Sequence, residues 1–277
     1  IKMPAKFGGD QYIAGQKEPV IDMPTRFVDF MRVLVPMAGD DTTPEGEQVN
    51  IYGNHVGSWN FAATAYLNQW KVKIYYEHYF DDHSQMFFQY GRWKDGHIGL
   101  EITFPKNRFI DTFVYEGLGT KDQTGPMLYD SFWGEFEEQI SAKDNYYNHY
   151  LYQGWQHWGM GIGNPLLPGP IYNKNGQITF ISNRVLAHHI GFCGSPCQSL
   201  SYRMLLSYSR HWGTYDNPLN EIKKQFNSLF EVTYAPQQLK GWSFTVSGAM
   251  DRGSMLGNNY GGMLVIRKQG IIKSGNK

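Results

Sequence analysis

The chain has 277 residues, with 25 basic and 25 acidic side chains and a formal net charge of zero. Aromatic residues make up 16% of it and charged residues 18%, which excludes an intrinsically disordered chain and the basic surface of a nucleic-acid-binding protein. The longest apolar stretches, such as residues 33–38, are far shorter than the roughly 18 residues of a membrane-spanning helix.

Alternation of apolar and polar side chains with a period of two residues dominates the sequence. Along residues 70–80 the even positions are apolar or aromatic, as at Ile74, and the odd positions are largely polar, as at Lys73, which is the pattern of a half-buried strand. Similar segments predict about ten strands, most of them near the nine to eleven residues of a tilted transmembrane strand. In the first predicted strand, residues 26–38, the charged residues Asp29 and Arg32 interrupt the apolar alternation. The predicted strands are residues 26–38, 58–67, 70–80, 97–104, 108–117, 178–193, 200–211, 225–235, 241–251 and 259–268.

Short turns and long loops alternate from residue 58 to the last strand. The predicted short turns are residues 68–69, 105–107, 194–199 and 236–240. The predicted long loops are residues 81–96, 118–177, 212–224 and 252–258. This alternation is typical of an up-and-down outer-membrane barrel with tight periplasmic turns, whereas a soluble β-sandwich has Greek-key connections. We therefore expect one all-β domain over residues 1–277, an antiparallel transmembrane β-barrel with residues 118–177 as a long external or plug-like loop.

Aromatic residues flank the predicted short turns, among them Trp70, Phe104, Phe109, Tyr234 and Trp242. They match the aromatic girdle at one rim of a membrane barrel. The alternative is cross-strand packing of aromatic side chains in a soluble sheet. Together with the alternating loops, these residues favour the membrane.

The strand period also predicts which side chains face lipid and which face the lumen. The residues expected to face lipid are Trp70, Val72, Ile74 and Tyr76, and those expected to face the lumen are Lys73, Tyr75 and Glu77. An inward hydrogen-bonded network is expected from His97, Glu101, Arg184, Arg203, Thr245 and Arg267.

No catalytic or cofactor motif is present: there is no Gly-x-Ser-x-Gly elbow, P-loop, His-Glu-x-x-His or dinucleotide fingerprint. The adjacent His188 and His189 would face opposite sides of a strand and could not hold one metal ion together. His78 and His83 flank two aspartates, but without a recognisable ligand spacing a solvated loop is the better interpretation. We therefore expect neither a metal site, nor a cofactor, nor an enzyme.

Two other patterns have a simple structural interpretation. Cys193 and Cys197 form a single pair, which is not a zinc site, and two small residues at the ends of a turn are favoured over a hairpin disulfide. Glu77 and Glu101 could serve as a glycosidase pair, but a polar, water-facing barrel lining is the better interpretation.

The predicted long loop at residues 118–177 is the richest in functional residues. It combines aromatic rings, which can cover the apolar faces of sugars, with amide and imidazole groups, which can bond to hydroxyls. The alternative is that Trp155 and Trp158 only fold the loop into the barrel mouth as a plug. The expected ligand-binding residues are Asn145, Tyr146, Tyr147, His149, Trp155, His157 and Trp158, with Asp81, His83 and Trp212 from neighbouring long loops.

Several strings resemble the Wzi family of capsule-assembly outer-membrane proteins, in the form common in Bacteroidetes-type bacteria. The resemblance covers roughly residues 48–268. The strings are GNHVGSW (53–59), YEHYFDDHS (76–84), WKDG (93–96), NYYNH (145–149), GWQHWGMGIGNPL (154–166), RVLAHH (184–189) and SRHWGTY (209–215).

The resemblance implies a barrel of about eighteen strands that attaches capsular polysaccharide to the cell surface in a lectin-like way, without catalysis. Because family members are longer and the ten predicted strands match only the later part of such a barrel, we expect the N-terminal strands to be missing from this sequence. The alternative is that the chain pairs with another protein. The expected partners are capsular or other surface polysaccharide, outer-membrane lipid and other outer-membrane proteins, in the outer membrane of a Gram-negative bacterium. The alternatives are a diffusion channel, a structural accessory subunit of a larger outer-membrane complex and, more distantly, a surface glycosidase. A plugged, aromatic-rich mouth favours binding, whereas a clear water path favours transport.

Overall fold

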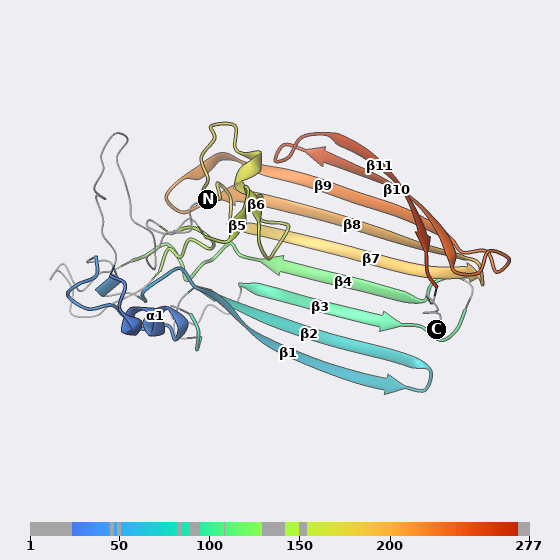
Figure 1. Cartoon of the computed structure of the whole chain (residues 1–277), viewed down its shortest axis with the longest axis horizontal. Coiled ribbons are helices and arrows are strands. Elements are labelled where there is room, and N and C mark those ends of the chain that lie inside the picture. The colour runs from blue at the N-terminus through green and yellow to red at the C-terminus, as the bar shows by residue number, and fades with distance from the viewer. Residues whose placement is uncertain are drawn as a thin grey trace, which may run out of the picture.

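A computed structural model of the chain describes residues 24–44, 47–48, 51–81, 85–88, 95–107, 109–128, 142–149 and 154–270. Its main feature is a nine-stranded antiparallel sheet in which the strands follow one another in chain order, without a crossover (Figure 1). The strands are β1 (Val56–Leu67), β2 (Trp70–Asp81), β3 (Gly96–Thr103), β4 (Thr112–Gly119), β7 (Val185–Cys197), β8 (Leu200–Gly213), β9 (Pro218–Tyr234), β10 (Trp242–Gly253) and β11 (Asn259–Lys268).

The helix α1 (Phe27–Leu34) and three short elements lie outside this sheet. The two-residue strands β5 (Gln156–His157) and β6 (Met160–Gly161) pair with each other, and η2 (Pro170–Tyr172) is one 3₁₀ turn. None of the helices in the described ranges is long and apolar enough to cross a membrane. The described residues are mostly antiparallel β-sheet, which is consistent with the predicted all-β class.

The first predicted strand, at residues 26–38, is wrong, because residues 27–34 form α1. Asp29, which breaks the alternating pattern, accepts hydrogen bonds from the backbone N–H of Arg26 at 2.8 Å and from its Nε at 3.0 Å. Arg32 pairs with the same carboxylate at 3.2 Å, three residues further along the helix. The hydrogen bonds from Arg26 lower the pKa of Asp29, which is fully buried. The two charged residues thus stabilise a helical turn, since positions three apart are neighbours on a helix.

Several boundaries also differ from the prediction; β4, for example, begins at Thr112 and not at residue 108. The expected long loop at residues 212–224 is a four-residue turn at residues 214–217, because β8 and β9 continue to pair as far as Gly213 and Pro218. β7 begins at Val185 and not at residue 178, since residues 178–184 belong to the loop that packs on the sheet. At its other end β7 runs on to Cys197, and both cysteines are free.

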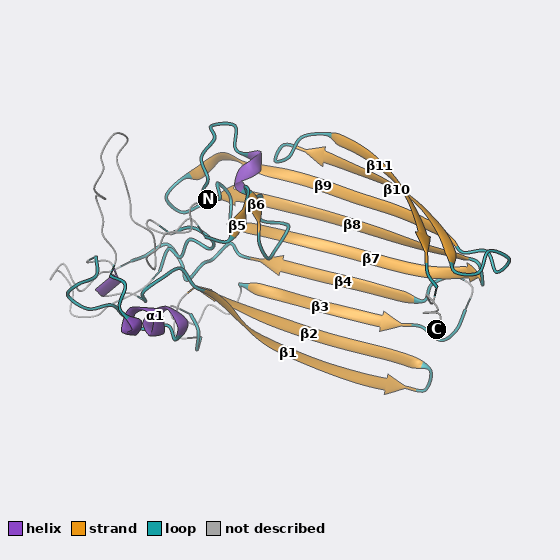
Figure 2. Cartoon of the chain, in the orientation of Figure 1, coloured by secondary structure: helices purple, strands orange, loops and turns teal. Residues whose placement is uncertain are grey.

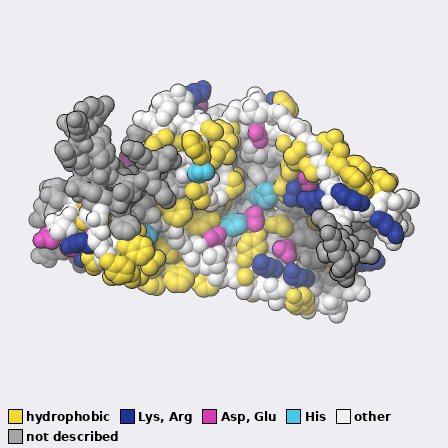
Figure 3. Space-filling view, in the orientation of Figure 1, with side chains coloured by type: hydrophobic (Ala, Val, Ile, Leu, Met, Phe, Trp, Pro, Cys, Tyr) yellow, Lys and Arg dark blue, Asp and Glu magenta, His cyan; other side chains and the backbone are white. Residues whose placement is uncertain are grey.

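The register divides the sheet into two faces of opposite character. On the inner face, one row of directly paired positions runs from β2 to β10 through Tyr75, Gly99, Glu116, His189, Ser207, Asn227 and Asp251. On the outer face, the next row runs from β1 to β9 through Ala63, Ile74, Leu100, Tyr115, Ile190, Leu206 and Ser228. Figure 3 shows histidine and charged side chains gathered over the middle of the inner face.

The predicted alternation along β2 is confirmed: its odd-numbered and even-numbered residues lie on opposite faces of the sheet. Lys73, Tyr75 and Glu77 share the inner face, and Trp70 and Ile74 share the outer one. Ile74 is 55% exposed there.

Most of the expected inward residues also lie on the inner face. Glu101 pairs with Lys71 at 3.5 Å, Arg203 with Glu231 at 3.3 Å, and Thr245 bonds to Thr233 at 2.8 Å. By register, His97 and Arg267 share that face. Arg184 is the exception: it precedes β7, and its guanidinium lies 3.8 Å from the ring centroid of Tyr215.

The two ends of the sheet differ in their connections. The turns β1–β2, β3–β4, β7–β8 and β9–β10 lie at one end, which we call the short-turn end (Figures 1 and 2). The long loops, α1 and the β8–β9 and β10–β11 turns lie at the other, which we call the long-loop end. The predicted long loop at residues 252–258 is only a five-residue turn at residues 254–258. At the long-loop end, loop residues pack on the inner face around Phe180 and Val185, which are almost completely buried. This core consists of Leu118, Tyr147, Leu167, Phe180, Val185 and Ala187. It holds part of the loop of residues 118–177 against β4 and β7.

Candidate functional site

A buried carboxylate anchors the loops at the long-loop end. Asp95, directly before β3, accepts hydrogen bonds from the backbone N–H groups of Asp122 at 2.9 Å and Gln123 at 2.6 Å. It also accepts one from the hydroxyl of Tyr146 at 3.1 Å. Burial raises the pKa of Asp95 to about 6, and burial also raises the pKa of Tyr146 well above its ordinary value. One side chain therefore fixes two loop segments to the sheet.

Tyr147 and Trp155 form an aromatic wall above the inner face. Their rings stack with centroids 5.6 Å apart and an interplanar angle of 20°. The hydroxyl of Tyr147 accepts a hydrogen bond from the backbone N–H of Asn164 at 3.0 Å, and Nε1 of Trp155 donates to Oδ1 of Asn54 at 3.2 Å. Both aromatic residues have positive φ angles, 74° and 54°. Their rings are therefore held at both edges, in a backbone conformation that the surrounding contacts must maintain.

A polar wall faces them from the sheet. Glu77 accepts hydrogen bonds from the hydroxyls of Ser58 at 2.7 Å and Tyr79 at 3.3 Å. His97 lies between two carboxylates, with Nδ1 3.8 Å from Glu77 and Nε2 3.6 Å from Glu116. These contacts join β1, β2, β3 and β4 in one network on the inner face.

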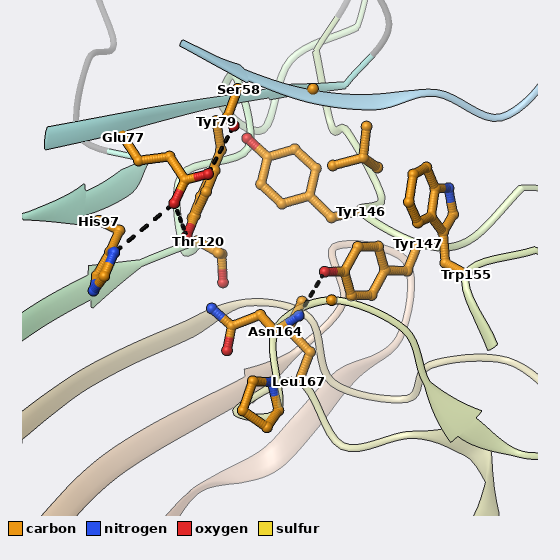
Figure 4. Close-up of a pocket in the computed structure, with 14 residues that line it drawn as sticks. Ser58, Glu77, Tyr79, His97, Thr120, Tyr146, Tyr147, Trp155, Asn164 and Leu167 are labelled. Atoms are coloured by element: carbon orange, nitrogen blue, oxygen red, sulfur yellow. Dashed lines mark hydrogen bonds and ion pairs between the residues drawn. The ribbon is translucent and has the colours of Figure 1, made fainter. Parts of the chain in front are cut away.

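A cavity of about 410 Å³ lies between the aromatic and the polar wall (Figure 4). A second cavity of about 340 Å³ shares the lining residues His97, Asn164 and Pro165 with the first. Both volumes are in the range of small-molecule sites. The first cavity is lined by Val56, Gly57, Ser58, Glu77, Tyr79, His97, Thr120, Tyr146, Tyr147, Trp155, Gly163, Asn164, Pro165 and Leu167. The pair of cavities offers room for successive units of an extended ligand along the inner face.

Some of the predicted ligand-binding residues line the first cavity, and others support it from behind. Tyr146, Tyr147 and Trp155 line the first cavity. Asn145 lies behind it, where its Oδ1 accepts from Nδ2 of Asn148 at 3.0 Å and from that of Asn183 at 2.5 Å. His149 also has a supporting position, with its Nε2 3.3 Å from the buried carboxylate of Glu47.

Four other predicted residues do not line the first cavity. His157 and Trp158 are at the β5–β6 turn, where their rings meet edge to face and Trp158 is 73% exposed. Asp81 ends β2, and Trp212 lies near the end of β8, where Lys121 and Arg210 both contact its ring. His83 is outside the described residues.

Sequence reasoning missed several lining residues, among them Ser58, Thr120 and Asn164. Thr120 and Asn164 come from loops whose path no periodicity indicates. Ser58 could have been found, because it begins the predicted strand at residues 58–67, and in the structure it lies directly opposite Tyr79 of β2.

The histidines are engaged in pairwise contacts. His188 and His189 face opposite sides of β7, as predicted: His188 lies 2.8 Å from the hydroxyl of Tyr115, and His189 lies 2.6 Å from that of Ser207. His78 is fully buried, with Nε2 2.9 Å from the carbonyl oxygen of Gln85. Among the described residues, no group of three or more His, Cys, Asp or Glu side chains is arranged to hold a metal ion.

Comparisons with protein families, with curated proteins and with solved structures found no match to this chain.

Proposed function

We propose that this chain forms part of a β-barrel in the outer membrane of a Gram-negative bacterium. There it binds a polysaccharide at the external end of the barrel and helps to attach capsule to the cell surface, without catalysis. The observation that carries the binding role is the first cavity, in which stacked aromatic rings face hydroxyl, carboxylate and amide groups. Sugars need this combination, since rings cover their C–H faces and polar groups bond to their hydroxyls.

The membrane location is supported by the contrast between the two faces of the sheet. Large apolar side chains on the outer face are widely exposed, as for Phe61 at 55%, Phe230 at 51% and Leu264 at 64%. Contiguous apolar surface of this kind marks contact with lipid or with another protein. The inner face carries the carboxylates and imidazoles that a water-facing lumen accommodates.

Aromatic residues at the short-turn end support the same location. Trp70 and Phe104 have ring centroids 5.1 Å apart, and Trp242 stacks on Phe244 at 6.3 Å. Rings of this kind favour the interface between hydrocarbon and water. Within the described residues β1 and β11 each pair with one neighbour, so the sheet is open, and in this proposal further strands close the barrel.

Binding is favoured over a diffusion channel by the path of the loop. Leu166 and Leu167 pack on Leu118 and Ala187 of the inner face. A channel needs a continuous water path, and this segment occupies part of that face at the long-loop end. A plugged mouth with cavities beside the plug suits a site that retains its ligand.

Retention of capsule tests the proposed function. Cells producing Glu77→Gln/Trp155→Ala, matched to wild type in outer-membrane protein level, are compared for cell-attached and released capsular polysaccharide. We expect most of the polysaccharide to be released, because the variant alters both walls of the cavity. Glu101→Gln/Trp158→Ala is the matched control, since neither residue lines either cavity. Equal retention by the two variants would contradict the binding role.

A further inference from the structure

Five basic side chains gather on the outer face at the long-loop end of the sheet. Arg210 of β8 is directly opposite Lys224 of β9, and Arg252 of β10 belongs to the next row, opposite Phe226. Arg184 extends the β7–β8 pairing, because the backbone N–H of Trp212 donates to its carbonyl oxygen at 3.0 Å. We call Lys121, Arg184, Arg210, Lys224 and Arg252 the rim cluster.

Aromatic rings hold part of the rim cluster in place. Nζ of Lys121 lies 5.5 Å from the ring centroid of Trp212, and the guanidinium carbon of Arg210 lies 5.3 Å from the same centroid. Arg184 stacks on Tyr215, and its Nε also donates to the carbonyl oxygen of Lys121 at 3.0 Å. Contacts with ring faces leave the outward N–H groups of these cations available to an anion.

No carboxylate of the described residues forms an ion pair with the rim cluster. Arg210 and Lys224 are like charges in directly opposed cross-strand positions, which is unfavourable unless an anion lies between or beside them. The register places strand carboxylates on the opposite, inner face: Glu77, Glu101, Glu116, Glu231 and Asp251.

The rim cluster borders an apolar band on the same face. The row that contains Arg252 continues through Phe226, Tyr208 and His188, and the following row contains Ile190 and Leu206. At the short-turn end, the outer face of the described strands carries one charged residue, Lys268, whose Nζ donates to the carbonyl oxygen of Lys240 at 2.5 Å. Positive charge is thus concentrated at the long-loop end, next to hydrocarbon-like surface.

We propose that the rim cluster binds the phosphate groups of an anionic glycolipid of the outer leaflet, of the lipid A class. This inference depends on the membrane location in the proposed function. Guanidinium and ammonium groups bind phosphate by charge-assisted hydrogen bonds, and basic clusters next to a transmembrane surface recognise anionic lipid headgroups. A lipid A molecule here would lay its acyl chains over the apolar band and its phosphates against the rim cluster.

The test is the binding of bisphosphorylated lipid A to the purified full chain in a non-ionic detergent, measured by native mass spectrometry at increasing salt. In Arg184→Gln/Arg210→Gln/Lys224→Gln we expect the affinity for lipid A to fall by about tenfold or more, with a weaker dependence on salt. Lys73→Gln/Lys223→Gln/Arg267→Gln removes the same charge from the inner face and should bind like wild type. Arg184→Lys/Arg210→Lys keeps the charge and should retain most of the binding, which separates loss of charge from misfolding.

Two outcomes overturn the inference. One is an equal loss of lipid A binding in the outer-face and inner-face triple variants. The other is full displacement of lipid A by inorganic pyrophosphate at equal concentration, which would identify a site for free phosphate and not for lipid. Insertion into phosphatidylcholine liposomes, followed by protection from protease, tests the membrane location separately. A chain that inserts but binds lipid A independently of the rim cluster would contradict this inference alone.

Discussion

The ring of Tyr75 lies directly over Gly99 on the neighbouring strand. A Cβ atom at Gly99 would overlap this ring, so only glycine leaves room for it. The phenol thereby crosses β3 and donates a hydrogen bond to Glu116 on β4. Glu116 in turn faces His97. Because Gly99 has no side chain, Tyr75 can reach across it, and the contacts of these residues connect β2, β3 and β4 on the inner face.

Replacing Gly99 with alanine should therefore displace the Tyr75 ring and lower the free energy of unfolding by about 1–3 kcal/mol, as overpacking does. Gly261→Ala is the control, because a Cβ at Gly261, which shares the inner face, would meet nothing within 4 Å. Urea titration of both variants in detergent micelles measures the difference. Equal stability would mean that Tyr75 can move aside at no cost.

Replacing Ile74 with arginine tests whether the outer face of the sheet contacts lipid. The residue is 55% exposed near the middle of β2, and a charge at the midplane of a bilayer should cost about 2–4 kcal/mol of unfolding free energy. Lys73→Arg, one position away on the inner face, should cost little. Denaturant titration in liposomes measures both variants. An Ile74→Arg protein as stable as Lys73→Arg would place the outer face in water.

Two tryptophans of the same loop should differ in their effect on ligand affinity. Trp155→Ala removes part of the aromatic wall and should weaken polysaccharide binding by about three- to tenfold, the contribution of one aromatic contact. Trp158→Ala should leave it unchanged, because Trp158 is exposed at the β5–β6 turn. Isothermal titration with purified capsular oligosaccharides compares them. If Trp158→Ala has the larger effect, the ligand binds on the loop surface and not in the cavity.

The buried Asp95 should give the protein a measurable dependence on pH. Its folded-state pKa of about 6 is above the ordinary value of 3.8, so the folded protein binds this proton more tightly than the unfolded chain does. Its contribution to stability is therefore present below about pH 4 and is lost as the pH rises through 6. In Asp95→Asn this slope should disappear. Melting temperatures of both proteins from pH 4 to 7 test this, and parallel profiles would show that Asp95 does not titrate in that range.

The sequence alone determines the strands and their faces. Alternation with a period of two is a local property, since successive side chains on a strand point to opposite sides, and it places Lys73 and Ile74 on opposite faces without knowledge of any neighbour. The same local rule fails at residues 26–38. There Asp29 and Arg32 are three positions apart in a helix, where the carboxylate of Asp29 pairs with both Arg26 and Arg32.

The candidate site depends on contacts that only the tertiary structure decides. Trp155 and Asn54 are 101 positions apart and Tyr146 and Asp95 are 51 apart, and no periodic pattern links residues so distant. The register brings Glu77 opposite His97, while the path of the loop decides that Trp155 lines the cavity and Trp158 does not. Loops lack the repeating hydrogen bonds that fix a strand, so their geometry follows from burial and from individual anchors such as Asp95.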